Sequence, residues 1–292
     1  MSLQLIINGI SIGSVYALIA VGFALVFGVL NFSNFAHGGV VSACAYVAYF
    51  FQTQANKPPF WMTVVVACGS GMMIAFLIDL LGYYRLRKKS SDSLYYFLSS
   101  ITFAIMLEQI LTVFFGTQMY AFTPVFKNTT MVLFGITFST MDMTILAIAI
   151  VLLALLILLV EKSRMGLAIR AVAINAKTSR LMGINSSLTV TGTLVIAGFL
   201  AGITGLMLGM KYTIYPALGP GMMLKGFIAS IIGGLGSLSG AIIASVLLGV
   251  VEITSIYYLG SEITPVISFG IMLVFLLVRP QGIAGRFAQN KA

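Results

Sequence analysis

The sequence predicts an all-α polytopic membrane protein with about eight apolar segments, some of them re-entrant or broken. Three observations predict this fold class. Of the 292 residues, 60% are hydrophobic and only 8% are charged, whereas a soluble domain carries about 25% charged residues. The apolar residues gather in long runs, and a helix that crosses the hydrocarbon core needs about 20 of them. The basic residues cluster between these runs, as the positive-inside rule describes.

The apolar segments differ in length, and two of them do not fit one full crossing. Segment 38–52 is short, and segment 225–258 is too long for one helix at about 1.5 Å per residue. Three glycines between Gly233 and Ser237 interrupt the long segment, so we expect a half-helix, a turn and a second helix. Such a break must face protein or water. In order, the segments are 4–30, 38–52, 60–82, 93–115, 141–160, 188–210, 225–258 and 263–278.

The first segment is expected to remain in the protein as a span, because no basic region precedes it and no clear cleavage site follows it. Glycines four residues apart occur in this segment and in three later places. Such pairs let helix backbones approach closely, and they predict tight helix packing there. The pairs are Gly9 and Gly13, Gly198 and Gly202, Gly205 and Gly209, and Gly236 and Gly240.

The basic clusters predict the orientation. Lysines and arginines concentrate in loop 83–92, loop 161–187 and the tail 279–292, so these parts are expected in the cytoplasm. The N-terminus is expected outside, because nothing basic precedes the first span, and parity requires segment 225–258 to leave and return to the same face. The remaining loops are also expected outside, namely 53–60, 116–140 and 211–224.

Four polar residues lie between the first two apolar segments: Asn31, Ser33, Asn34 and His37. Amide, hydroxyl and imidazole groups are costly in hydrocarbon unless they are hydrogen-bonded. They can cap the two helices and bond between them, or they can line a path for a transported solute. The residues leave both interpretations open, and the two can coexist.

Acidic side chains occur inside two apolar segments. Glu108 costs roughly 2.5–3.5 kcal/mol at the bilayer centre, so it is expected to face the bundle, a cavity or a partner chain. Glu252 is expected to do the same, and either a structural ion pair or a proton relay would explain both. Three further charged residues lie near segment ends and are expected at the membrane interface, namely Asp79, Asp142 and Lys225.

Enzymatic motifs are absent from the sequence. It contains no GxxxxGK[ST] run to hold a nucleotide phosphate, no HExxH and no Cys/His ligand set. Cys44 and Cys68 both lie in apolar segments and are expected to be buried and unpaired. We therefore expect no catalytic residue, no metal site and no cofactor in this chain. Nucleic-acid binding is also disfavoured, because the basic residues lie between membrane segments.

Loop 161–187 is longer than a connection between two spans requires. Apolar residues such as Leu167, Ile174 and Leu181 recur in it at helical spacing among basic residues, and Gly183 is expected to end the helix. The pattern predicts an amphipathic helical hairpin. It would dock onto a partner protein or lie on anionic lipid, and the residues alone favour neither.

This loop resembles the coupling segment of branched-chain amino acid ABC permeases, the LivH/LivM family. The matching residues are Arg164-Met-Gly166, Ile169-Arg170-Ala171, Asn175 and Leu181-Met-Gly183-Ile-Asn185. Gly39 stands where the family is expected to have an acidic residue. Further stretches resemble the same family in order: Asn8-Gly9, Gly13-Ser14-Val15-Tyr16-Ala17-Leu18 and Gly22, then Asn34-Phe35-Ala36-His37-Gly38, then Gly233-Gly234-Leu235-Gly236-Ser237 with Gly240, and Arg279-Pro280-Gln281-Gly282.

The resemblance implies a single transmembrane permease domain over 1–292, in the bacterial inner membrane, with the coupling segment 161–187 inside it. A second permease subunit, LivM-like or another copy, would pair with the chain. Two cytoplasmic ABC ATPases would bind ATP, and an extracytoplasmic binding protein would deliver the substrate. The residues expected to contact the ATPase are Arg164, Gly166, Arg170, Ala171, Asn175 and Gly183.

The implied function is import of branched-chain or related amino acids by alternating access. Urea or another small polar solute is the alternative substrate. A stand-alone secondary transporter is the alternative class, and it would use Glu108, Glu252 and His37 as ion or proton sites. The residues expected to line the substrate pathway are Asn31, Asn34, His37, Glu108, Gly234 and Gly236.

Overall fold

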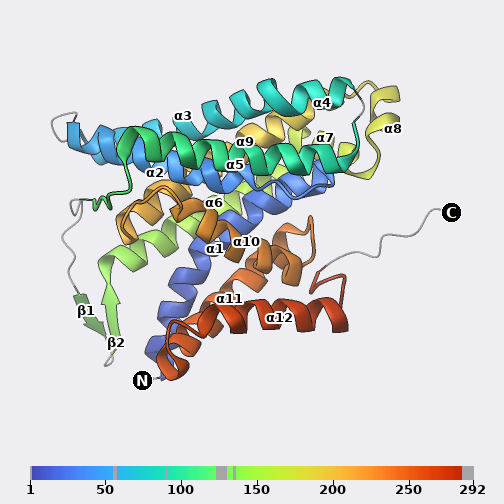
Figure 1. Cartoon of the computed structure of the whole chain (residues 1–292). Helices are drawn as coiled ribbons and strands as arrows, with labels where there is room; N and C mark the ends of the chain where they lie inside the picture. Colours follow the sequence, from blue (N-terminus) through green and yellow to red (C-terminus); the bar gives the residue numbers. More distant parts are fainter. Residues whose placement is uncertain (1, 55–57, 90, 123–129, 134–135, 285–292) are drawn as a thin grey trace.

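The computed structural model describes residues 2–54, 58–89, 91–122, 130–133 and 136–284. These residues form a helical bundle with one small antiparallel hairpin, so the all-α membrane fold is confirmed (Figure 1). Within this part of the chain, six helical stretches are long and apolar enough to cross a membrane. They are Leu3–Leu30, Phe60–Lys88, Ser93–Phe115, Thr140–Lys162, Ser186–Lys211 and Leu238–Leu259.

The helices follow the predicted segments closely, and the hairpin lies in the loop predicted over 116–140. In chain order the elements are α1 (Ser2–Leu30), α2 (Ala36–Gln54), α3 (Phe60–Ile78), the π-helix η1 (Asp79–Tyr83), α4 (Tyr84–Lys88), α5 (Ser93–Phe115), β1 (Thr130–Leu133), β2 (Ile136–Ser139), α6 (Thr140–Lys162), α7 (Arg164–Ile174), α8 (Ala176–Leu181), α9 (Ser186–Lys211), α10 (Leu218–Gly233), α11 (Leu238–Leu259) and α12 (Thr264–Val278).

The long segment is broken as predicted. Helix α10 ends at Gly233 and α11 begins at Leu238. Gly234 and Gly236 adopt φ of 104° and 84°, a region that side chains with a Cβ rarely enter. The Ser237 side chain accepts a hydrogen bond from the Gly240 N–H and so caps α11.

Two predicted loops are partly helical, and these expectations were wrong. Helix α10 begins at Leu218, inside the expected loop 211–224. Pro220 lies in its first turn, where a missing N–H is tolerated, and Gly219 permits close contact with α2. The expected loop 83–92 is helical as far as Lys88, so most of its basic residues belong to the helical stretch Phe60–Lys88 instead of a connecting loop.

Glycine contacts draw the helices together as predicted. Helix α9 packs on α3, where a Cβ added at Gly198 would lie 2.4 Å from the Gly71 carbonyl oxygen. A Cβ at Gly205 would lie 2.4 Å from the carbonyl oxygen of Val41 in α2. Helix α1 packs along α11, and its Gly13 lies directly against Val246. These positions therefore tolerate no side chain without separating helices.

Helix α1 passes diagonally through the bundle, in contact with α6, α7, α9, α10 and α11 (Figure 1). Helices α4, α7 and α8 lie at one end of the bundle, at the right of the view, and the hairpin and the N-terminus lie toward the other end. The basic stretches of α4 and α7–α8 therefore share one end, in agreement with the predicted orientation. Residues 285–292 of the predicted cytoplasmic tail lie outside the described residues.

Candidate functional site

The segment from Arg164 to Asn185 forms two short helices that its own polar residues delimit. The Ser163 side chain accepts a hydrogen bond of 2.9 Å from the Gly166 N–H at the start of α7. Asn175 ends α7 and caps α8, because its side-chain oxygen accepts from the N–H of Lys177 and of Thr178. Gly183, at φ 83°, ends the hairpin. The predicted helical hairpin is therefore present.

Helix α7 is seated directly on the end of α6. A Cβ at Gly166 would lie 2.2 Å from the carbonyl oxygen of Val160, so only glycine permits this approach. The Arg170 guanidinium donates a hydrogen bond to the same carbonyl. A backbone contact and a charge-assisted hydrogen bond therefore join α7 to the end of α6 at one point.

The outward face of α7 and α8 combines exposed apolar and basic side chains. Ile174, Leu181 and Met182 expose 84%, 88% and 79% of their surface. Lys177 and Arg180 lie between Ile174 and Leu181 in the sequence and are also exposed. Large apolar side chains exposed to this degree are typical of a surface that binds a protein or a membrane. Of the predicted coupling residues, Arg164 is also exposed here, and Ala171 is half-buried.

A cavity of about 600 Å³ lies beside this seat. Three of the predicted residues line it together: Asn31 from the end of α1, Arg170 from α7 and Gly236 from the glycine turn. Asn31 has a φ of 53°, the only positive φ among the described non-glycine residues, and its N–H donates to Phe27 to end α1. The cavity connects the coupling segment to the turn between α10 and α11.

The turn before α11 is covered by the chain that follows α12. The N–H groups of Ile283 and Ala284 donate to the carbonyls of Ile232 and Gly233 at 2.8 and 3.0 Å. A Cβ at Gly282 would lie 2.3 Å from the backbone nitrogen of Gly234. The stretches 233–237 and 279–282, which both resemble the LivH/LivM family, are thus in direct backbone contact.

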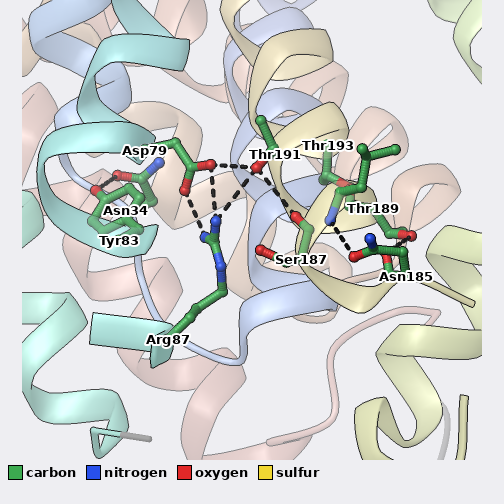
Figure 2. Close-up of polar contacts among 10 residues, drawn as sticks. Asn34, Asp79, Tyr83, Arg87, Asn185, Ser187, Thr189, Thr191 and Thr193 are labelled. Atoms are coloured by element: carbon green, nitrogen blue, oxygen red, sulfur yellow. Dashed lines mark hydrogen bonds and ion pairs between the residues drawn. The ribbon is translucent and has the colours of Figure 1, made fainter. Parts of the chain in front are cut away.

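Asn34 and His37 lie inside the bundle, with only 5% and 3% of their surface exposed. Asn34 accepts a hydrogen bond of 2.8 Å from the Tyr83 hydroxyl (Figure 2), which is the interhelical bond that the sequence left as one of two interpretations. The His37 Nε2 atom has no partner among the described residues and lies against Gly22. The cavity at these side chains has a volume of only about 10 Å³.

The sequence did not predict a buried ionic network that joins η1, α4 and α9 (Figure 2). Arg87 donates to both carboxylate oxygens of Asp79, at 2.5 and 2.9 Å, and to the Thr191 hydroxyl at 3.3 Å. Asp79 was expected at the membrane interface, and the structure shows that the bundle encloses its side chain, which is only 3% exposed. The two charges are eight residues apart, too far for the usual helical pairing at three or four.

A second ion pair joins α10 to α11. The Lys225 ammonium contacts the Glu252 carboxylate and donates to the Tyr16 hydroxyl at 3.0 Å. Pairing was one of the two expectations for Glu252. Lys225 was expected at the membrane interface near the start of its segment, and it lies within α10, which starts earlier than predicted. Asp142, also expected at the interface, pairs with Lys211 at 2.6 Å.

Glu108 is half-buried on α5, and none of the described residues donates a hydrogen bond to its carboxylate. Most of the large apolar side chains of α5 are exposed, including Val113 and Phe114 at 80% and 76%. This face of α5 therefore meets lipid or another chain.

The described residues contain no group of three or more His, Cys, Asp or Glu side chains able to hold a metal ion.

Comparison with known proteins identifies the family. Residues 5–276 match the family model described as branched-chain amino acid transport system, permease component. The permease protein LivH of the high-affinity branched-chain amino acid transport system of Escherichia coli K12 is 32% identical over 97% of this chain and 96% of its own length.

Two other relatives agree. The permease protein BraD of the high-affinity branched-chain amino acid transport system of Pseudomonas aeruginosa is 33% identical over the same shares of both chains. A probable branched-chain amino acid transport permease protein LivH of Methanocaldococcus jannaschii is 37% identical over 44% of each chain. On the family match and the near full-length relatives, this chain belongs to the family of permease components of branched-chain amino acid transport systems.

Proposed function

We propose that the chain is the permease subunit of an ATP-binding-cassette importer that moves branched-chain or related amino acids across the inner membrane. The whole chain acts as one permease domain. ATP is bound by two separate cytoplasmic ATPases rather than by this chain, and an extracytoplasmic binding protein delivers the substrate. The family and the names of the relatives support the substrate class.

One observation carries the mechanism, namely the seat of α7 on α6. An ATPase that holds the exposed residues Ile174 and Leu181 moves α7, and the contacts of Gly166 and Arg170 with Val160 pass this motion to α6. The cavity between α7 and the glycine turn changes shape at the same time. Alternating access then follows from movement of α6 relative to the turn between α10 and α11.

The second permease subunit, a LivM-like chain or another copy of this one, completes the pathway. The exposed apolar face of α5 supports such a partner, and Glu108, half-buried within the span Ser93–Phe115, has no hydrogen-bond partner for its carboxyl group among the described residues. An isolated carboxylate in hydrocarbon is costly. The proposed pathway residues remain Asn31, Asn34, His37 and Glu108 with the glycines of the turn before α11.

The surface test uses Leu181→Glu and Met182→Glu in the complete complex. A charge at these exposed positions removes apolar contact with the ATPase, so the ATPases should no longer co-purify and ATP-dependent leucine uptake into proteoliposomes should stop. Met119→Glu is the matched control, since Met119 is 71% exposed but lies after α5 near the opposite end. ATPases retained by both α8 variants would contradict the docking site.

The coupling test uses Arg170→Met and Gly183→Ala. Both variants should insert normally and keep the ATPases, but less leucine should enter per ATP hydrolysed, because α7 and α8 no longer move together with α6. Normal coupled uptake in both variants would overturn the assignment of the coupling residues.

Uptake by the chain without ATPases, under an ion gradient, would instead identify a secondary transporter. Uptake of urea in preference to leucine would overturn the substrate class.

A further inference from the structure

Three membrane-spanning helices surround an apolar slot that the proposed mechanism does not use. The slot is a cavity of about 460 Å³ between α6 on one side and α3 and α9 on the other. Its lining residues lie within 60–72 of α3, 141–152 of α6 and 199–210 of α9. Helix α6 itself packs against α1 and α7, so the slot lies beside the helix that the coupling segment contacts.

The lining of the slot is suited to hydrocarbon. Thr144 has the only hydroxyl among the lining residues, and this group donates to the Thr140 carbonyl at 2.8 Å. A polar solute would therefore lose its hydrogen bonds to water in the slot without replacing them. Four of the lining residues are methionines, whose flexible side chains adapt to an irregular apolar partner. They are Met72, Met141, Met207 and Met210.

The dimensions of the slot match one lipid chain. The lining stretch of each helix is roughly 16–18 Å long at about 1.5 Å per residue. One leaflet of a hydrocarbon core about 30 Å thick is ~15 Å deep. The volume, spread over this length, gives a mean cross-section of roughly 30 Å², less than half that of a helix of ~10 Å diameter. The slot is thus too narrow for a helix of a second permease subunit.

The slot begins at the membrane interface on the side predicted to be outside. Trp61, next to the lining residue Phe60, is 63% exposed, and tryptophan is enriched at the interface. Lys211, next to Met210, donates to Asp142 and Ser11, and lysines near helix ends reach toward the interface. Val65 lines the slot and is 61% exposed, so the slot is continuous with the outward apolar face of α3.

We propose that one acyl chain of an outer-leaflet phospholipid occupies this slot and separates α6 from α3 and α9. The chain supplies the atoms that the lining side chains would otherwise lack as packing partners. Because the chain is flexible, α6 shifts against it without opening a void. The lipid site is independent of the proposed function, and only the role of the lipid in the movement of α6 rests on it.

Photocrosslinking of the unmodified protein tests the site. The complete complex is reconstituted in liposomes that contain phosphatidylglycerol with a diazirine midway along one acyl chain. After illumination, mass spectrometry should find lipid adducts on Ile203 and Met207, which are only 5% and 3% exposed. Leu200 is on the same helix and 1% exposed, but it does not line the slot, and it should carry no adduct.

Two results of this experiment would overturn the site. The first is a lack of adducts on Ile203 and Met207, or equal adducts on Leu200. The second is loss of the adducts in excess L-leucine, which would identify the substrate as the occupant. Adduct formation requires neither ATP nor substrate, so it tests the site even in a preparation that shows no uptake.

A matched pair of variants then tests the role of the lipid. Ile148→Trp places a large side chain in the slot and should reduce the adducts on Met207 at least about tenfold. Ile150→Trp makes the same change on the outward face of α6, where Ile150 is 57% exposed, and should leave the adducts unchanged. Equal adduct yields in the two variants would contradict the site. ATP-dependent leucine uptake should fall in Ile148→Trp alone, and normal uptake without adducts would exclude a role of the lipid in moving α6.

Discussion

Asp79 and Arg87 show how single charged residues are accommodated inside the bundle. Asp79 begins the π-helix η1, and the long side chain of Arg87 in α4 reaches back along the helix to this carboxylate, two turns away. The third contact, from Thr191 in α9, connects the span Phe60–Lys88 to the span that follows the coupling segment, Ser186–Lys211. A charge held this way is tolerated because its hydrogen bonds are satisfied within the bundle.

Asp79→Asn and Arg87→Met should each destabilise the detergent-solubilised protein, by about 3–5 kcal/mol, because one charge is left buried and unpaired. The double variant should lose less than the sum of the two, since it leaves no uncompensated charge. Thermal unfolding of the four proteins, arranged as a double-mutant cycle, measures the coupling. Additive losses would mean that the two side chains do not interact.

At the scale of elements, helix contacts depend on glycine where backbones meet. Helix α9 packs on both α2 and α3, and it approaches α3 at Gly71, where a Cβ would lie 2.1 Å from the Gly198 carbonyl oxygen. Gly69, two residues earlier on the same helix, has no atom within 4 Å of such a Cβ. The same residue type thus has a packing role at one position and none at the other.

Gly71→Ala should therefore lower the thermal stability of the purified protein by pushing α3 away from α9. Gly69→Ala should leave it unchanged or raise it slightly, since alanine has the higher helix propensity. The two variants share the helix and the chemical change, so the difference between their melting temperatures isolates the contact. Equal melting temperatures would show that α3 and α9 are not in backbone contact.

At the scale of the whole molecule, the bundle has two distinct ends. Helices α4, α7 and α8 collect at one end, with their lysines and arginines, and the connection between α11 and α12 lies toward the other (Figure 1). The positive-inside rule assigns the basic end to the cytoplasm. The proposed function requires this assignment, because ATP and its ATPases are found there.

Single-cysteine labelling tests the sidedness. Lys177 in α8 and Glu262 before α12 are both exposed, and the two native cysteines are buried, which keeps background labelling low. A membrane-impermeant maleimide should label Glu262→Cys in intact, right-side-out cells and Lys177→Cys only in inverted vesicles. Labelling of Lys177→Cys from outside would reverse the orientation and exclude contact with a cytoplasmic ATPase.

The sequence by itself determined the spans, the break before α11 and the helical hairpin of the coupling segment. These features depend on local properties: hydropathy over about 20 residues, glycines that adopt positive φ, and caps such as Asn175 that bond to their own neighbours. It also placed Asn31, Arg170 and Gly236 among the functional candidates, but it gave no sign that they surround one cavity.

Only the tertiary structure decided which polar groups meet. The pairs of Asp79 with Thr191 and of Lys225 with Tyr16 join residues more than 100 positions apart. The tertiary structure also placed the buried His37 ring against Gly22 of another helix. Such contacts depend on the rotation and depth of each helix relative to the others, which interhelical packing fixes. A side chain's own segment contains no information about its partner on another helix.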